Sequence, residues 1–152
     1  MIIKKNTHAP LRLPKLLINP KVLEYNVTFT DSCRYDIGED QTDINKLFGI
    51  GYFPFHHWNS VRIGWAYNPT TDKIDISAYW YEKGQRKWQE TVRKNIGEEI
   101  NFKIEIGKHN HYISINNSYA TIPLPGQRLG YLLRPYFGGN RKAPHDIEIK
   151  GI

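Results

Sequence analysis

Tyrosine and arginine side chains gather at positions that alternate with apolar ones along the chain. They share the polar phase of segments with two-residue periodicity: Arg62, Tyr79, Tyr81, Arg134 and Tyr136. A tyrosine ring can stack on a sugar ring, and a guanidinium donates paired hydrogen bonds to carboxylates or hydroxyls. Tyrosine also suits protein contacts, and it is a good strand former on any half-exposed sheet face. The pattern predicts a binding face for a glycan or a protein, or a plain solvated face.

A loop with ring-bearing side chains precedes the first of these segments. His56 and His57 are adjacent and are followed by Trp58. Adjacent side chains on a strand point to opposite faces, so the two imidazoles do not converge on one metal ion. His57 and Trp58 complete the predicted ligand-binding set.

From the sequence we assign no catalytic residue, and we expect no metal and no other cofactor. Cys33 is the only cysteine, which excludes an intramolecular disulfide and a thiol-ligated metal site. His109 and His111 have the spacing of a shared strand face, but the turn beside them places one in a loop. The acidic residues between Asp31 and Asp43 lack the spacing of a calcium-binding loop, so we expect a solvated acidic loop there.

From Val22 onward, apolar and polar residues alternate with a period of two, which is typical of half-buried strands. The segments with this pattern are 22–29, 61–67, 74–81, 100–106, 111–115, 119–124, 130–137 and 147–149. Trp65 and Trp80 fall on apolar faces and are predicted core residues. One short helix is expected at Asp43 to Phe48, with Thr42 as its N-cap. The predicted fold is an all-β antiparallel sandwich of jelly-roll type spanning residues 22–152.

Residues 1–21 are expected to form an extended arm. Prolines at positions 10, 14 and 20 favour extended backbone, while leucines give the arm an apolar character. The predicted docking residues of the arm are Leu11, Leu13, Leu16 and Leu17. The arm then packs on its own domain or on a neighbouring subunit, and the second case gives a homo-oligomer.

Composition limits the function classes. The chain has 152 residues, a formal net charge of +6 and 13% aromatic residues, which predicts one folded domain. The cationic residues form no helical stripe, zinc-finger spacing or RNP-type motif, so specific nucleic-acid binding is not expected. No run is long and apolar enough for a membrane span, and the start lacks a signal-peptide pattern. With a single free thiol, we expect synthesis in a reducing cytoplasm.

The order of strands resembles the concanavalin-like jelly roll of legume-type lectins, laminin-G-like modules, glucanases and some polysaccharide lyases. The resemblance rests on Asn59–Trp65, Lys73–Tyr79, Phe102–Ile106 and His111–Asn116, followed by a last C-terminal strand. The glucanases' paired-carboxylate strand and the alginate lyases' Gln-x-His strand are absent. The segments Tyr136–Asn140 and Ala143–Asp146 also look like parts of small β-sandwich proteins of bacteria and phages.

Three hypotheses follow. The leading one is a non-enzymatic binding module, with a glycan as the ligand that the resemblance implies. The second is a structural or assembly protein of a phage particle, motivated by the apolar arm. The third is a polysaccharide lyase with Arg62, His57 and Tyr136 in its cleft, because such a set can neutralise a uronate and move a proton.

Overall fold

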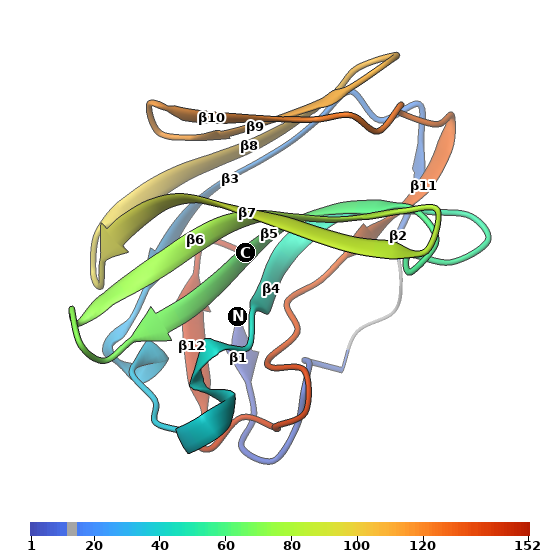
Figure 1. The fold of residues 1–152 in the computed structure, drawn as a ribbon. Coiled ribbons are helices and arrows are strands. Elements are labelled where there is room, and N and C mark those ends of the chain that lie inside the picture. Colours follow the sequence, from blue (N-terminus) through green and yellow to red (C-terminus); the bar gives the residue numbers. More distant parts are fainter. Residues whose placement is uncertain (12–14) are drawn as a thin grey trace.

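The computed structural model describes residues 1–11 and 15–152. Within them the chain forms two six-stranded antiparallel sheets that pack face to face (Figure 1). The first sheet has the spatial order β1 (Ile2–Ile3), β12 (Ile147–Lys150), β3 (Val22–Phe29), β8 (Glu99–Ile106), β9 (His111–Ile115), β10 (Ser118–Ile122). The second has the order β2 (Lys15–Ile18), β11 (Leu129–Leu133), β4 (Asn45–Tyr52), β5 (Ser60–Asn68), β6 (Lys73–Glu82), β7 (Gln85–Asn95). The predicted all-β sandwich is confirmed.

The core lies between the two sheets, where the apolar phase of each strand points inward. Trp65 is completely buried, and its indole packs against Phe29 with ring centroids 5.1 Å apart. Trp80 is partly buried and packs against the same core. Both tryptophans therefore belong to the core, as the periodicity predicted. The alternate residues of β5 and β6, which include Arg62 and Tyr79, form the outer face of the second sheet.

The helix expected at Asp43 to Phe48 is wrong. A short 3-10 helix, η2 (Gly38–Thr42), ends before this segment, and another, η1 (Asp31–Cys33), follows β3. Residues 45–52 form β4, a central strand between β11 and β5. Nearly all of β4 is buried, because side chains such as those of Arg62 and Tyr131 cover Gly49 and Gly51 on its outer side. These glycines and a register shift between Lys46 and Gly49 leave its sequence without a clean two-residue alternation. Pairing with two distant strands outweighs the local helix signals.

The N-terminal arm contributes a strand to each sheet. β1 pairs with β12, and β2 pairs with β11. Leu16 is exposed and Leu17 is half-buried, while Leu11 is fully exposed. Leu13 lies outside the described residues. The arm thus packs on its own domain through β2, and Leu11 and Leu16 remain on the surface.

A buried histidine links the two sheets at one end of the core. The hydroxyl of Tyr52 lies 2.6 Å from Nε2 of His111, and Nδ1 lies 2.6 Å from the carbonyl oxygen of Leu124. A carbonyl only accepts, so Nδ1 carries the proton and Nε2 accepts from Tyr52. Burial lowers the pKa of His111 below its ordinary value, against the opposing effect of the Leu124 carbonyl. The ring is therefore neutral in the folded protein at neutral pH.

Because His111 is buried in its neutral form, we expect the protein to lose stability in mild acid. In the unfolded chain this histidine binds a proton below about pH 6.5, whereas in the folded protein it does not. The free energy of unfolding therefore falls as pH decreases, by up to about 1.4 kcal/mol per pH unit for each such histidine. His56, whose pKa burial lowers to about 4, adds to the same slope. Urea unfolding between about pH 5.5 and 7 measures it. His111→Gln should remove about half of the slope; an unchanged slope would contradict the assignment.

Candidate functional site

The outer face of the second sheet aligns the predicted tyrosine and arginine side chains in rows. In the strand register Arg62 of β5 lies opposite Tyr79 of β6, and Tyr79 lies opposite Trp88 of β7. One row further along, Ser60 lies opposite Tyr81. Because residues two apart on a strand share a face, these side chains all stand on the side away from the core.

Glycines of β4 leave room for large side chains to lie flat on this face. A Cβ atom on Gly49 would meet Cγ of Arg62 at 2.8 Å and the carbonyl oxygen of Val61 at 2.1 Å. A Cβ on Gly51 would meet the ring of Tyr131 at 2.9 Å. The side chains of Arg62 and Tyr131 therefore pass over β4 where side chains are missing, and the face is hollowed at this point.

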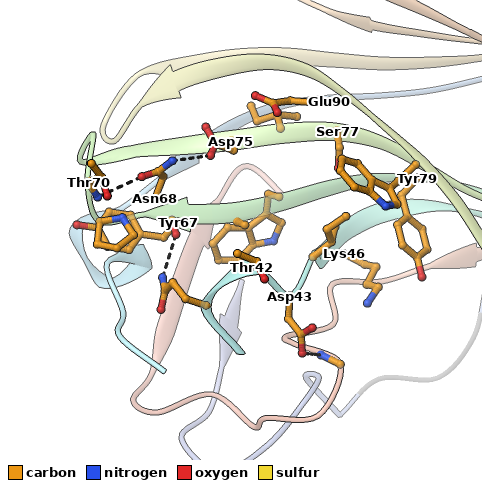
Figure 2. A pocket seen from close by; sticks show the side chains of 18 of the residues that line it. Thr42, Asp43, Lys46, Tyr67, Asn68, Thr70, Asp75, Ser77, Tyr79 and Glu90 are labelled. Atoms are coloured by element: carbon orange, nitrogen blue, oxygen red, sulfur yellow. Dashed lines mark hydrogen bonds between the residues drawn. The ribbon is translucent and has the colours of Figure 1, made fainter. Parts of the chain in front are cut away.

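Two adjoining pockets form one groove along this face. They have volumes of about 610 and 670 Å³ and share the side chains of Lys46, Tyr79 and Arg86. We call the first the basic half, bordered by Lys46, His56, His57, Arg62, Tyr79, Tyr81, Arg86, Tyr131, Arg134 and Tyr136. We call the second the acidic half, bordered by Asp43, Lys46, Asn68, Thr70, Asp75, Ser77, Tyr79, Arg86, Trp88 and Glu90. Figure 2 shows the acidic half, with Lys46 and Tyr79 at its junction with the basic half.

Arg62 places a buried positive charge on the floor of the basic half. The residue is only 7% exposed, and its Nη2 donates to the carbonyl oxygen of Arg134 at 2.7 Å. Within residues 1–11 and 15–152 it has no ion pair with a carboxylate, and its Nε has no hydrogen-bond partner. Burial lowers the pKa of Arg62 to about 10, so the guanidinium stays charged at neutral pH. A buried cation without a counter-ion is costly unless an anion completes it.

Further polar atoms beside Arg62 are also without partners. In the described part of the chain, Oγ of Ser60 and Nε of Arg134 are buried and make no hydrogen bond. Native proteins contain few buried polar atoms without a hydrogen-bond partner, and such atoms often mark a site for a ligand, ion or water. Of these residues Arg134 borders the basic half with Arg62, so two guanidinium groups place free donors where an anionic group can be bound, whereas Ser60 borders neither pocket.

Lys46 lies between the two halves, a position that the sequence did not reveal. Its Nζ is 5.1 Å from the ring centre of Tyr79 and 5.9 Å from that of Tyr136, and it donates to the carbonyl oxygen of Gly138 at 3.3 Å. Burial, followed by the charge of Arg62, lowers the pKa of Lys46 to about 8. A substantial fraction of the amine is therefore neutral in mildly alkaline solution and can accept a proton.

The tyrosines beside Lys46 form a chain of aromatic contacts. The rings of Tyr79 and Tyr81 have centroids 5.9 Å apart, and His57 packs edge-on against Tyr81 at 5.2 Å. Burial first, and then the neighbouring Tyr81 hydroxyl, raises the pKa of Tyr79 above its ordinary value. Tyr79 therefore keeps its proton at neutral pH and can donate it.

The structure gathers six of the seven predicted ligand-binding residues around the basic half: His57, Arg62, Tyr79, Tyr81, Arg134 and Tyr136. Trp58 borders neither pocket; it lies over the β6–β7 turn, where its ring is 3.6 Å from a Cβ built on Gly84. Its carbonyl accepts from the Gly84 amide at 3.0 Å, which holds the loop in that place. We therefore no longer assign Trp58 to the groove.

The N-terminal arm forms part of the wall of the basic half. Ala9 and Pro10 border the pocket, and the ring of His8 stacks on Tyr136 with centroids 4.9 Å apart. The amide of Phe137 donates to the carbonyl of His8 at 2.6 Å. These contacts fix the position of Tyr136 at the end of the groove.

Two kinds of feature are absent from residues 1–11 and 15–152. These residues hold no group of three or more histidine, cysteine, aspartate or glutamate side chains that could bind a metal ion together. In the same ranges, no helix has the length and apolar character that a membrane crossing requires.

No protein-family model matches the chain, and no curated protein matches it. Among solved structures, it is similar to the alginate lyase vAL-1 from Chlorella virus, with 13% identity over 99% of this chain and 83% of that one, at a TM-score of 0.58. It is also similar to a Bacteroides ovatus mixed-linkage-glucan GH16 protein in complex with a G4G4G3G product, with 11% identity over 89% and 68% of the two chains, at a TM-score of 0.51. The chain thus has the concanavalin-like jelly-roll fold that its strand order suggested.

Proposed function

We propose that the groove binds an acidic polysaccharide and cleaves it by β-elimination, as a polyuronate lyase. The observation that carries the proposal is the buried, unpaired guanidinium of Arg62 at the floor of the groove in the described part of the chain. The similar Chlorella virus protein, an alginate lyase, supports the same class of reaction. Of the three hypotheses from the sequence, the lyase accounts for more of the groove than a non-enzymatic module does.

The charge of the basic half favours an acidic ligand. The residues that border it include four cationic side chains, Lys46, Arg62, Arg86 and Arg134, and no carboxylate from the described ranges 1–11 and 15–152. A uronate carboxylate can take paired hydrogen bonds from Arg62 and satisfy its free Nε. The surrounding tyrosines offer ring faces and hydroxyls to the sugar.

The same residues can perform β-elimination. A carboxylate neutralised by Arg62 makes the proton on the adjacent carbon, C5, more acidic. The neutral amine of Lys46 removes that proton, the electron pair forms a double bond between C4 and C5, and the bond from C4 to the glycosidic oxygen breaks. The phenol of Tyr79 donates a proton to the departing oxygen. The products are a saturated end and an end with an unsaturated uronate, and the Lys46 proton returns to Tyr79 through solvent.

Hydrolysis by paired carboxylates fits this groove poorly. Glycosidases generally use two carboxyl groups that flank the bond. In the acidic half Asp75 is tied to Arg93 and to the amide of Asn68, and Asp43 accepts from the backbone amides of Gly139 and Asn140. Neither is left as a free acid or base, so Glu90, the remaining carboxylate of this half, has no second free carboxyl group to act with among the residues that the structure describes.

The direct test is incubation of the protein with a panel of polyuronates while the ultraviolet absorbance of unsaturated product is recorded. An increase with at least one polymer, together with the matching shorter chains, supports the lyase. Binding without any increase in absorbance supports a non-enzymatic glycan-binding module instead. Neither binding nor cleavage of any acidic glycan would refute both.

The pH dependence of the reaction should report the Lys46 amine. Below about pH 8 the amine is protonated, so the rate should rise about tenfold per pH unit and level off above that value. The groups facing Lys46 are Asp43, Arg62, Arg86 and the rings of Tyr79 and Tyr136. A pH–rate profile of kcat/KM measures this limb, and Lys46→Gln should abolish it. A flat profile over this range would exclude Lys46 as the base.

Exposed leucines of the arm favour an assembly role as a second candidate function. β2 is an edge strand, and Leu16 and Ile18 on it are 55% and 63% exposed. Exposed apolar side chains on an edge strand favour association. Light scattering of the Leu16→Lys, Ile18→Lys double variant should show a smaller assembly than the parent protein; an identical mass for both would exclude this contact.

A further inference from the structure

The two halves of the groove differ in charge. The basic half is bordered by four cationic side chains, whereas the acidic half adds the carboxylates of Asp43, Asp75 and Glu90. Arg62 and Ala66, which lies opposite Asp75, are four residues apart on β5, or about 13 Å along a strand. The two ends are therefore far enough apart to contact different units of one polysaccharide chain.

Glu90 is the carboxylate of the acidic half with the weakest partner. It lies opposite Ser77 in the register of β6 and β7, its side chain is 61% exposed, and its Oε1 is 3.9 Å from Nη2 of Arg93. By contrast, Asp75 is held by Arg93 and Asn68, and Asn68 accepts from the amide of Thr70 (Figure 2). The carboxylate of Glu90 thus stays available to repel an anion or to accept from a hydroxyl.

Other groups of the acidic half suit a sugar with hydroxyls and no carboxylate. Trp88 is 55% exposed and stands beside Tyr79 in the register, so its ring offers a stacking surface at the junction. Ser77 adds a hydroxyl.

We propose that the groove selects a mixed polysaccharide, with a uronate in the basic half and a neutral sugar in the acidic half. This inference rests on the proposed function. A second uronate placed in the acidic half would face the exposed carboxylate of Glu90 as a like charge, because the cations of this half, Lys46 and Arg86, are the ones that it shares with the basic half. A neutral unit can donate to the carboxylate of Glu90, exchange hydrogen bonds with the Ser77 hydroxyl and stack on the ring of Trp88.

Cleavage of defined polymers tests the inference. The probes are homopolymers of mannuronate, guluronate and glucuronate, and a polymer in which glucuronate alternates with a neutral hexose. The protein should cleave the alternating polymer with kcat/KM about tenfold above that of any homopolymer. Glu90→Lys should reduce or reverse this preference by lowering KM for the homopolymers. Glu99→Lys makes the same charge change at an exposed position of β8 on the other sheet and should leave the preference as it is.

The outcomes separate the two proposals. Cleavage of a homopolymer as fast as the alternating polymer, with no difference between Glu90→Lys and Glu99→Lys, would overturn the mixed-polymer inference and leave the lyase standing. No cleavage of any uronate-containing polymer would overturn both. An equal gain on homopolymers from the two lysine variants would show that only overall charge matters, and would also overturn the inference.

Discussion

Arg62→Met should abolish most of the activity while leaving the protein at least as stable as before. Without the guanidinium the uronate carboxylate keeps its charge as C5 loses its proton, and kcat/KM should fall about 10³-fold, the loss typical of removing one charge-stabilising donor. The free energy of unfolding, by contrast, should not fall. A buried charge without a counter-ion keeps its desolvation cost, so replacing it by an apolar side chain of similar length should leave the free energy of unfolding unchanged or raise it.

Two further variants sharpen this result. Arg62→Lys keeps the charge but loses the planar pair of donors, so it should restore little of the activity. Arg128→Gln removes an exposed arginine outside the groove and should change neither activity nor stability. Steady-state kinetics on the cleaved polymer and urea unfolding give both readouts. Loss of activity together with a large loss of stability would instead assign Arg62 a structural role.

The sandwich could be predicted from the sequence because most strands alternate large apolar residues with polar or small ones. β3, β5, β6 and β8 alternate clearly, so their bounds and the core position of Trp65 follow from a period of two. β4 was not predicted because its outer positions include Gly49 and Gly51, and a register shift between Lys46 and Gly49 interrupts the two-residue period. β7 was not predicted because it is an edge strand and largely exposed, so its sequence looks like a solvated run of polar residues.

The candidate site was predicted in part for the same reason. Arg62, Tyr79 and Tyr81 belong to alternating strands, so the phase of the pattern placed them on one face. Lys46 was missed because it lies on β4, in a segment that we interpreted as a helix. Trp88 was missed with β7. What brings Lys46 to Tyr79 is the pairing of β4 with β5 and of β5 with β6, and local sequence does not encode such pairing.

The charge difference between the two halves of the groove also depends on this pairing. Glu90 and Asp75 come together with Ser77 only after β6 and β7 pair, with a register shift between Ile76 and Ser77. In the sequence these acids lie among basic residues and look like ordinary surface charge. Their effect on a ligand therefore becomes visible only when the groove that they border is known.

Tyr79→Phe should reduce kcat by about 10²–10⁴, the range for loss of a general acid, with little change in KM. The variant loses only the hydroxyl, so the ring still packs against Tyr81 and still faces Nζ of Lys46. Tyr119→Phe, on the outer face of the first sheet where the ring is 75% exposed, is the matched control and should retain full activity.

A substrate with a better leaving group separates acid catalysis from a structural role for Tyr79. A uronate that carries a nitrophenoxy group at C4 needs no proton on the departing oxygen, so Tyr79→Phe should cleave it nearly as fast as the parent protein does. Lys46→Gln should remain slow on this substrate, because removal of the C5 proton is still required. If Tyr79→Phe is equally impaired on both substrates, the hydroxyl does not donate to the leaving group, and the proton must come from another group beside Lys46.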